Sequence, residues 1–489
     1  MKSIYGKILG DLLIAERNVT TLCPVFFSDS RRFSPGSGFA AIPGTAFDGH
    51  DFILSALEKG ASLIVMEKEI PLPPGTPVLL VKECAAAFAL LVRHTAGNPD
   101  EKLRLYGVTG TNGKTTSAFL LEHIFNFSRR PCGLVSTVEY RTGERIIPGE
   151  RTTPDAAALF ALFAEMQRNS LSCAVMELSS HSLVQNRAAG IKLETGIFTN
   201  LTGDHLDYHG SMENYYQAKK RLFTHYLAPG GTAVVNADDP WGARLCRELE
   251  GTVKLLSFSV ENKAVCRIRD QKLQSTGSVF TLEYPEYGTL EIASNLTGSY
   301  NVRNLAGAAL TALAAGIAPE TIAAALKIPV CVPGRLESFA LPGGGTAYVD
   351  YAHTDDALIN VLQAVRPVTP GRLCVLFGAG GDRDKSKRPR MGKAAAQWAD
   401  HLYVTSDNPR SEDPGQIING ILSGVPAGTS LEVIPERKNA IAQALGSCAA
   451  NDAVVIAGKG HENYQEIKGV KIPFSDIEEI KNFIRESKP

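Results

Sequence analysis

Paired cysteines, long apolar runs and an excess of either charge are all missing from this sequence of 489 residues. The nine cysteines stand singly, without a C-x-x-C pair, so neither a disulfide framework nor a structural zinc site is indicated. No apolar run approaches the ~20 residues that span a bilayer, and the first residues lack the apolar core of a secretory signal. We therefore expect a cytoplasmic protein that does not insert into membranes.

The charges nearly cancel, with 50 Lys and Arg against 51 Asp and Glu and a formal net charge of -1. A nucleic-acid-binding surface needs an excess of basic residues, so we expect no nucleic-acid partner. Any anionic ligand must instead be met by local basic side chains. The length suits about three domains of ordinary size.

One stretch, residues 105–125, has the layout of a phosphate-binding loop. An apolar run breaks at Gly110 and Gly113 and resumes as a pattern typical of a helix. Backbone N–H groups of a glycine loop at a helix start face an anion, and the helix dipole adds partial positive charge. Lys114 would reach the β- and γ-phosphates of a nucleotide, and the Thr115 hydroxyl is placed to hold Mg²⁺.

The match to the generic Walker pattern is incomplete, because its first glycine would fall on Val108. The alternative is an ordinary glycine turn before a helix. Lys114 and two threonines directly at the helix start favour nucleotide binding.

Strands and helices alternate along the chain, which predicts an α/β fold. Boundaries are indicated by the Asn-Pro-Asp turn at residues 98–100 and by the segment at residues 331–335. The predicted domains are a small N-terminal α/β domain (residues 1–98), a central doubly wound, mostly parallel sheet (99–332) and a C-terminal Rossmann-like α/β domain (333–489).

Polar clusters follow two strands of the central domain. Glu177 ends a buried apolar strand, and Asp204 and His205 follow the next one, where ligands of such sheets bind. Glu177 could share Mg²⁺ with Thr115, the alternative being a salt bridge. His205 is a candidate metal ligand, the alternative being a structural turn. Further on, a helix at residues 212–223 carries three adjacent basic residues that the pattern alone describes as a solvated face: Lys219, Lys220 and Arg221.

Eight motifs in one order make the chain resemble the Mur ligases, ATP-dependent enzymes that add amino acids during peptidoglycan precursor synthesis. The resemblance covers essentially the whole chain. It is strongest to the member that adds diaminopimelate to UDP-N-acetylmuramoyl-L-alanyl-D-glutamate. The motifs are residues 110–116, 152–154, 177–181, 203–209, 300–304, 333–337, 350–353 and 407–410.

The resemblance implies a site for ATP and two Mg²⁺. Lys219 matches the lysine that the family carries as N6-carboxylysine, and this carbamate would allow a second Mg²⁺ beside His205. The implied catalytic residues are Lys114, Glu177, His205 and Lys219, and the implied metal ligands are Thr115, Glu177, His205 and the Lys219 carbamate. The implied ATP-binding residues are Gly110, Thr111, Asn112, Gly113, Lys114, Thr115, Thr116, Asn301 at the adenine, and Arg335 and Asp350 closing from the third domain.

The muramoyl-peptide site is likewise implied by the resemblance. Thr152, Thr153, Ser179, Gln185 and Arg187 fall where the family contacts the peptide part, Ser30 where it contacts the uridine part, and Thr45 in a further contact loop. Two departures stand out. The loop at residues 45–47 differs from the His-Gln-Ala of some members, and Asp355 replaces a common proline. We expect the second change to leave activity intact.

The third-domain motif selects the amino acid. Diaminopimelate differs from lysine by a carboxylate on the far carbon, and the planar fork of Arg410 can bind such a group bidentately. Taken alone, residues 407–410 would form an Asx-Pro turn. The implied diaminopimelate-binding residues are Arg383, Asp407, Asn408, Pro409, Arg410, Gly458 and Glu462.

The implied reaction has two steps. The D-glutamyl γ-carboxylate attacks the γ-phosphate of ATP, and the amine of diaminopimelate then displaces phosphate from the acyl phosphate. His181 and His209 could assist proton removal. A folylpolyglutamate or cyanophycin-type ligase is one alternative, but it should lack the pocket at residues 407–410. A non-catalytic scaffold is another, but it would require loss of residues such as Lys114 that are present. We expect small-molecule substrates and a monomer.

Overall fold

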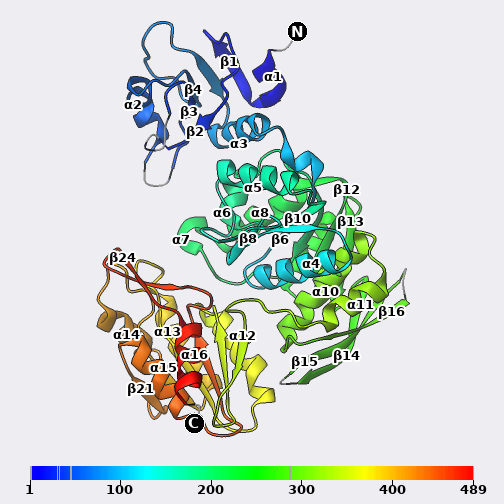
Figure 1. Ribbon diagram of the computed structural model, residues 1–489, viewed down its shortest axis with the longest axis vertical. Coiled ribbons are helices and arrows are strands. Elements are labelled where there is room, and N and C mark those ends of the chain that lie inside the picture. The colour runs from blue at the N-terminus through cyan, green and yellow to red at the C-terminus, as the bar shows by residue number, and fades with distance from the viewer. Residues whose placement is uncertain are drawn as a thin grey trace.

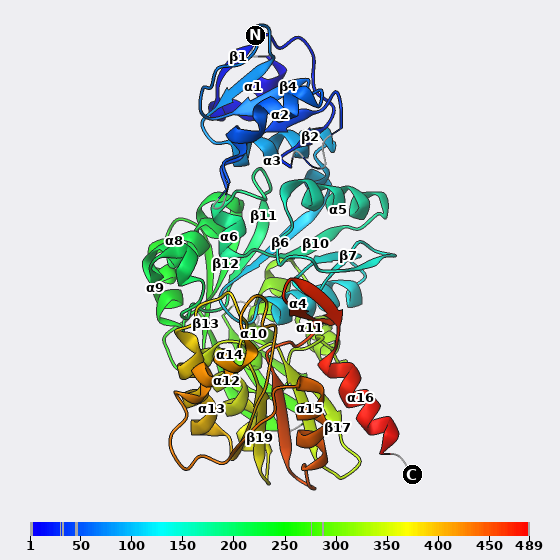
Figure 2. The same ribbon diagram turned by 90° about the vertical axis from the view of Figure 1, so that its left-hand side faces the viewer.

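The computed structural model describes residues 3–29, 31, 34–44, 47–274, 276–285 and 288–487, and shows three α/β units stacked along the long axis (Figures 1 and 2). The predicted α/β class with mostly parallel sheets in three parts is confirmed. The predicted uridine contacts Ser30 and Thr45 lie outside the described residues. Within the described part, no helix is long and apolar enough to cross a membrane.

The N-terminal unit is a five-stranded sheet of order β1-β5-β4-β3-β2, in which only the β1–β5 pair is antiparallel. β4 and β5 are fully buried, as their unbroken apolar sequences require. Its elements are α1 (Ile4–Leu9), β1 (Leu13–Arg17), β2 (Phe26–Phe27), β3 (Gly38–Ala40), α2 (Ile53–Glu58), β4 (Leu63–Met66), β5 (Val78–Val81) and α3 (Cys84–Thr95).

The middle unit is an eleven-stranded sheet of order β16-β15-β14-β13-β12-β11-β6-β10-β7-β8-β9. Its central strands are parallel, and the antiparallel pairs lie at its two edges. The strands are β6 (Arg104–Thr109), β7 (Cys132–Val135), β8 (Glu139–Arg141), β9 (Ile146–Pro148), β10 (Cys173–Glu177), β11 (Leu193–Phe198), β12 (Leu227–Asn236), β13 (Lys254–Ser259), β14 (Cys266–Gln274), β15 (Gly277–Tyr284) and β16 (Gly288–Ser294). The helices are α4 (Lys114–Phe127), α5 (Ala156–Arg168), α6 (Ser180–Val184), α7 (Leu206–His209), α8 (Met212–Arg221), α9 (Pro240–Leu249), α10 (Ser299–Ala314) and α11 (Pro319–Lys327).

The C-terminal unit is a six-stranded sheet of order β17-β18-β22-β19-β20-β21 with a separate hairpin, β23–β24. Only β17 is antiparallel within the six-stranded sheet. The strands are β17 (Glu337–Ala340), β18 (Thr346–Asp350), β19 (Leu373–Phe377), β20 (His401–Val404), β21 (Leu431–Val433), β22 (Ala453–Ala457), β23 (Tyr464–Ile467) and β24 (Val470–Pro473). The helices are α12 (Asp355–Val365), α13 (Lys387–Trp398), α14 (Pro414–Leu422), α15 (Arg437–Gly446) and α16 (Asp476–Glu486).

The hydrophobic cores divide the molecule differently from the sheets. One core runs without a break from the N-terminal unit into the middle unit, with Leu63 and Leu91 on one side and Leu105 and Phe160 on the other. The C-terminal unit has two cores of its own, one on each face of its sheet. The first two units therefore share one core, whereas the third has separate cores, one of which Tyr300 of the middle unit packs against.

Candidate active site

A cleft of about 450 Å³ lies between the middle unit and the C-terminal unit. Every residue of the predicted ATP-binding set except Gly110 lines it, so chain positions more than 200 residues apart meet there. The structure thus places the predicted nucleotide residues together.

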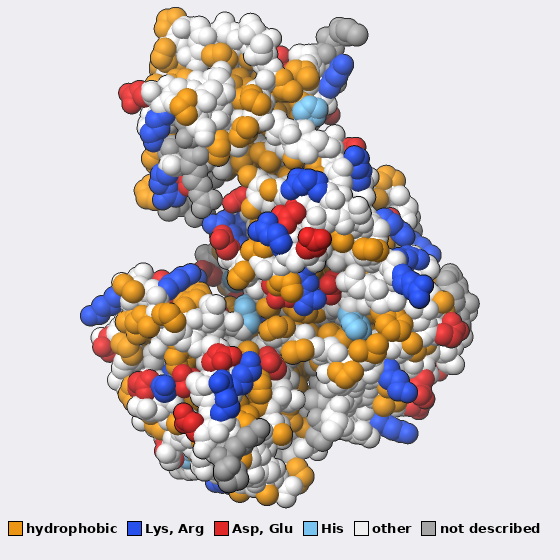
Figure 3. All heavy atoms as spheres, in the orientation of Figure 1, with side chains coloured by type: hydrophobic (Ala, Val, Ile, Leu, Met, Phe, Trp, Pro, Cys, Tyr) orange, Lys and Arg blue, Asp and Glu red, His pale blue; other side chains and the backbone are white. Residues whose placement is uncertain are grey.

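On the face drawn in Figure 3, a hollow lies between the N-terminal and C-terminal units, bordered by Lys, Arg, Asp and Glu side chains.

The predicted phosphate loop connects β6 to α4, at the centre of the sheet. Gly113 is the N-cap of α4 with φ +86°, a conformation that favours glycine. A Cβ on Gly113 would lie 2.3 Å from Asn304 Oδ1, and one on Gly110 would lie 1.9 Å from Thr199 Oγ1. Both glycines are therefore required by the close approach of α10 and β11, and the first-turn N–H groups of α4 have no intrahelical acceptors.

Two buried lysines share one acceptor below this loop. Lys114 Nζ donates to the carbonyl oxygens of Gly110 (2.9 Å) and Thr111 (2.8 Å), and Lys219 Nζ donates to Gly110 at 2.7 Å. Burial lowers the pKa of both amines, and the charge of Lys114 lowers the pKa of Lys219 further. Lys219 Nζ also lies 4.5 Å from the centre of the Tyr215 ring. Burial and the charge of Lys114, rather than the ring contact, favour a neutral, nucleophilic amine at Lys219.

The three basic residues of α8 have different surroundings. Lys219 is 1% exposed, so the alternative of a solvated face is wrong for this residue. Lys220 pairs with Glu248 at 2.9 Å, and Arg221 donates to Asn186 Oδ1 at 2.7 Å. The packing of α8 against the phosphate loop distinguishes residues that the sequence pattern could not.

Glu177 is fully buried at the end of β10. Its carboxylate accepts hydrogen bonds from Thr137 N (2.8 Å) and Thr137 Oγ1 (3.1 Å). Among the described side chains none forms an ion pair with Glu177 within 4.0 Å, so the salt-bridge alternative finds no support. The carboxylate instead lines the cleft.

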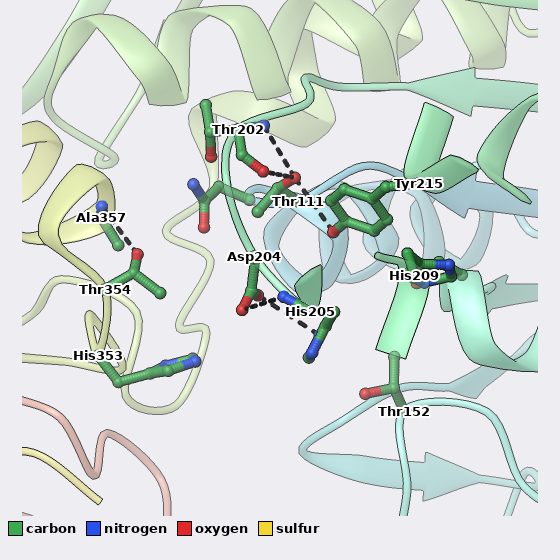
Figure 4. Close-up of polar contacts among 12 residues, drawn as sticks. Thr111, Thr152, Thr202, Asp204, His205, His209, Tyr215, His353, Thr354 and Ala357 are labelled. Atoms are coloured by element: carbon green, nitrogen blue, oxygen red, sulfur yellow. Dashed lines mark hydrogen bonds and ion pairs between the residues drawn. The ribbon is translucent and has the colours of Figure 1, made fainter. Parts of the chain in front are cut away.

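A group of imidazoles gathers beside the cleft (Figure 4). His205 Nε2 lies 3.4 Å from Asp204 Oδ2, and the His205 ring packs 4.9 Å from that of His181. His209 Nε2 instead lies 2.9 Å from Ser180 Oγ and is buried. Burial lowers the pKa of His205 and of His209 to about 4, so both rings are neutral near pH 7. A neutral, half-exposed His205 can act as a metal ligand.

The C-terminal unit contributes to the same cleft. Arg335 Nη2 donates to Thr115 Oγ1 at 3.2 Å. Asp350 accepts from the N–H groups of Leu336 (2.7 Å) and Ala352 (2.8 Å), and burial raises its pKa to about 6. The Arg335 contact brings a charged side chain of the C-terminal unit to the first turn of α4.

Sequence reasoning missed a second contact across the cleft. Asn112 Nδ2 donates to Asp356 Oδ2 at 3.0 Å, between residues 244 positions apart. Tyr351, whose ring lies 4.7 Å from the Arg335 guanidinium, was also missed. Both lie beside predicted site residues, but only the docking of the two units reveals the contact between Asn112 and Asp356.

The predicted muramoyl-peptide residues form a connected polar group around Glu177. Thr153 Oγ1 donates to the Glu177 carbonyl (2.9 Å) and accepts from Ser179 N (3.1 Å). Arg187 donates to the Thr153 carbonyl (2.8 Å) and to Gln185 Oε1 (2.9 Å). Thr152 Oγ1 lies 3.0 Å from Thr137 Oγ1, within hydrogen-bond distance. The structure brings these residues together, and their predicted roles in binding stay predictions.

Most of the predicted diaminopimelate residues meet at the carboxyl ends of β20 and β22. Asn408 Nδ2 donates to Glu462 Oε2 at 2.8 Å, and a Cβ on Gly458 would lie 2.4 Å from Asp407 Oδ2. Pro409 and Arg410 continue the same loop. Arg383 is exposed and donates only to the neighbouring Asp382 carbonyl, so it stands apart from these contacts.

Lys459 is a residue of this pocket that sequence reasoning missed. Its side chain is fully buried, and Nζ donates to Glu462 Oε2 (2.9 Å) and Asn408 Oδ1 (3.1 Å). A lysine between two glycines directly after a buried strand was the available signal. The amine compensates the charge of Glu462 and fixes the Asn408 amide.

Comparisons with known proteins agree with this architecture. Three family models match the chain: "Mur ligase middle domain" at residues 108–312, "Mur ligase, glutamate ligase domain" at 334–460 and "Mur ligase family, catalytic domain" at 27–94. A protein of Parasynechococcus marenigrum named UDP-N-acetylmuramoyl-L-alanyl-D-glutamate--2,6-diaminopimelate ligase is 43% identical over 471 residues, covering 94% of each chain. A protein of the same name from Aquifex aeolicus is 40% identical, covering 93% of this chain and 92% of its own.

Comparisons with solved structures agree with the comparisons of sequence. A structure of a UDP-N-acetylmuramoyl-L-alanyl-D-glutamate--2,6-diaminopimelate ligase is 33% identical with a TM-score of 0.67, covering 95% of each chain. A MurF ligase from Thermotoga maritima in complex with ADP shares the fold at 20% identity, with a TM-score of 0.64, and covers 95% of this chain and 98% of its own. A Mycobacterium tuberculosis folylpolyglutamate synthase shares it at 18% identity and a TM-score of 0.60, over 75% of this chain and 91% of its own.

Proposed function

The chain belongs to the Mur ligase family, and on that premise we propose that it is an ATP-dependent ligase of peptidoglycan precursor synthesis. It adds meso-diaminopimelate to the D-glutamyl γ-carboxylate of UDP-N-acetylmuramoyl-L-alanyl-D-glutamate. The observation that carries the proposal is the meeting of Lys114, Glu177 and His205 in one cleft with Arg335 of the C-terminal unit. That set can neutralise a triphosphate and hold it beside a second substrate.

Phosphoryl transfer calls mainly for positioning and positive charge. The first-turn N–H groups of α4 and the Lys114 amine lie where a β- or γ-phosphate would be bound. The Arg335 guanidinium, 3.2 Å from Thr115 Oγ1, adds charge from the opposite wall. The D-glutamyl carboxylate then attacks the γ-phosphate and gives an acyl phosphate and ADP. No side-chain nucleophile takes part.

The donor set of the cleft suits Mg²⁺. Carboxylate and hydroxyl oxygens are the ligands this ion prefers, and Glu177 and Thr115 supply one of each. The described residues hold no group of three or more His, Cys, Asp and Glu side chains that could bind a metal by themselves. The proposed ligands are therefore Thr115, Glu177, His205 and a modified Lys219. Bound Mg²⁺ would neutralise charge on the phosphate oxygens.

We assign the N6-carboxylysine modification to Lys219. Its amine is buried, has a lowered pKa and lies beside Lys114 on a shared carbonyl, so two positive charges would compete there. The neutral amine that this competition favours adds carbon dioxide and loses one proton, and the carbamate formed carries a negative charge that attracts the Lys114 ammonium. Lys219→Arg keeps a cation but cannot form the carbamate.

The second step takes place at the pocket of residues 407–410. Arg410 binds the far carboxylate of diaminopimelate as a planar fork, with Asp407, Asn408, Gly458 and Glu462 around the rest of the amino acid and Arg383 at its edge. The free amine attacks the acyl phosphate carbonyl and expels phosphate. Of the two candidate proton acceptors, His181 is the better placed. Its ring packs against that of His205 beside the cleft, whereas His209 is held by its contact with Ser180.

The proposal extends to the organisation of the chain. Residues 1–98 bind the uridine nucleotide through Ser30 and Thr45, residues 99–332 bind ATP, and residues 333–489 bind the incoming amino acid. We propose that the protein acts as a monomer. The nine cysteines are all free, which suits the reducing cytoplasm.

ADP release tests the proposal. The assay contains UDP-N-acetylmuramoyl-L-alanyl-D-glutamate, ATP and Mg²⁺ with either meso-diaminopimelate or L-lysine, for the wild type, Arg410→Ala and the control Arg485→Ala. Arg485 is an exposed arginine of α16 in the same unit. We expect turnover with diaminopimelate in the wild type and control only. Equal use of lysine would remove the selecting role of Arg410, and no ADP with either amino acid would refute the ligase.

A further inference from the structure

The β23–β24 hairpin frames the loop of residues 407–410 from one side. Gln465 Nε2 donates to the Asp407 carbonyl (2.6 Å), and Glu466 N donates to Asn408 Oδ1 (2.9 Å). Arg410 N donates to the Glu466 carbonyl at 3.0 Å, so the loop pairs with β23 like a short parallel strand. The hairpin is thus built into the proposed amino-acid pocket, although none of its residues belongs to the predicted site.

The Arg410 side chain has a carboxylate partner within this hairpin. Arg410 Nε lies 3.3 Å from Glu466 Oε2, while Nη1 donates to the Gly381 carbonyl at 2.7 Å. The two side chains are 21% and 26% exposed, so the pair is largely withdrawn from water. Nη2 takes no part in either contact. Arg410 is held in a fixed orientation with one edge already facing a negative charge.

We propose that Glu466 is a specificity-determining residue that weakens the discrimination of this pocket between diaminopimelate and lysine. The inference rests on the proposed function, because it concerns the far end of the amino-acid substrate. With lysine bound, no substrate carboxylate faces Arg410, and Glu466 supplies the missing negative charge. An arginine without such a partner would be left buried and unpaired, which would penalise lysine more heavily.

Glu466 lowers the affinity of the pocket for diaminopimelate, whereas it favours the binding of lysine. The far carboxylate of this substrate must share the guanidinium with Glu466, so two negative charges lie side by side on one arginine. Both substrates carry a far ammonium, so its attraction to Glu466 does not distinguish them. The partner that Glu466 gives to Arg410 when lysine is bound, and the repulsion between Glu466 and the far carboxylate of diaminopimelate, both narrow the difference in kcat/KM between the two substrates, and removing the Glu466 charge widens it.

Glu466→Gln in the full-length protein tests this inference. The glutamine oxygen can still accept from Arg410 Nε, so the orientation of the arginine is retained while the charge is lost. We expect kcat/KM for meso-diaminopimelate relative to L-lysine to rise by roughly threefold to fivefold, the upper part of the range measured for exposed charge pairs. The matched control is Glu478→Gln, which removes the same charge from exposed α16 of the same unit.

A second variant, at Arg410 itself, separates the effect of the Arg410–Glu466 pair from general effects of removing the Glu466 charge. In Arg410→Gln, which lacks the guanidinium charge, Glu466→Gln should change the substrate ratio by no more than about twofold. A ratio that is unchanged or lower in Glu466→Gln overturns the inference, and so does an equal rise in both backgrounds. If the wild type releases ADP with neither amino acid, the proposed function falls and the inference falls with it.

Discussion

The two junctions between the units of this protein differ in the kind of contact that they contain. Between the N-terminal and middle units, α3 packs against α5 within one continuous apolar core, and Arg93 pairs with Asp100 at 2.9 Å where the chain crosses. Between the middle and C-terminal units, the contacts are polar, including Arg335–Thr115 and Asn112–Asp356. Tyr300 also packs against the core of the C-terminal unit.

We infer that the apolar junction stabilises the arrangement of the first two units, whereas the polar junction serves the proposed reaction. Apolar burial is non-directional and favours a fixed docking of two surfaces. Polar contacts across a cleft exchange with water at little net cost, so small charged ligands can replace or join them. The proposed reaction uses the second junction, and the first junction places the N-terminal unit, which we propose binds the uridine nucleotide, at a fixed distance from it.

Leu91→Ala in α3 should break the apolar junction and give the largest expected effect. Leu91 is fully buried in the shared core, so its truncation should cost about 2–5 kcal/mol of unfolding free energy in urea titrations. The KM for ATP should stay unchanged. Leu54→Ala, in exposed α2, is the control and should cost less than about 0.5 kcal/mol. Equal losses in the two variants would contradict the shared core.

Lys114→Met addresses the polar junction instead. Losing one preorganised charge should lower kcat/KM for ATP by about 100- to 1000-fold. The melting temperature should not fall, because the substitution removes a buried amine whose pKa burial already lowers. Steady-state kinetics and thermal melts check both parts, with the exposed Lys481→Met as control. Activity retained within about tenfold would contradict the assignment.

The pH dependence of the unfolding free energy gives a further test of the polar junction, because the buried carboxyl of Asp350 lines the cleft there. Burial raises the pKa of Asp350 from 3.8 to about 6, so the folded protein binds this proton more tightly than the unfolded chain does. Stability should therefore fall as pH rises from about 4 to about 6, by up to roughly 1.4 kcal/mol per pH unit for this one group, and level off above. Asp350→Asn should remove that contribution in urea titrations across the pH range. An unchanged slope would contradict the buried carboxyl.

The smallest expected effect concerns one contact between the units. Asp356→Ala removes the partner of Asn112 and should raise the KM for ATP by about threefold to tenfold, about the net worth of one hydrogen bond. Asp355→Ala is the control, because Asp355 pairs with Arg390 inside the C-terminal unit. It should change the KM by less than about twofold. The same result for both variants would remove Asp356 from the junction.

Much of this architecture follows from local sequence. The phosphate loop, the carboxylate at Glu177 and the helix of residues 212–223 lie where strand ends and glycines predicted them. These features depend on short-range signals, namely apolar periodicity and turn chemistry, which a single sequence carries.

What the sequence could not reveal depends on contacts between distant segments. Asp356 meets Asn112 only because two separately folded units dock, and Glu466 meets Arg410 only because a hairpin pairs with a loop. Lys219 differs from Lys220 in burial rather than in local pattern, so the family resemblance and not the composition identified it.

Hydrogen–deuterium exchange tests the contrast between the two junctions most directly. The exchange is compared with and without a non-hydrolysable ATP analogue, Mg²⁺ and UDP-N-acetylmuramoyl-L-alanyl-D-glutamate. The account predicts slower exchange at residues 110–117, 333–337 and 350–357, and no change in the helices α3 and α5 that join the first two units. Protection at α3 and α5 with none at residues 333–357 would contradict it.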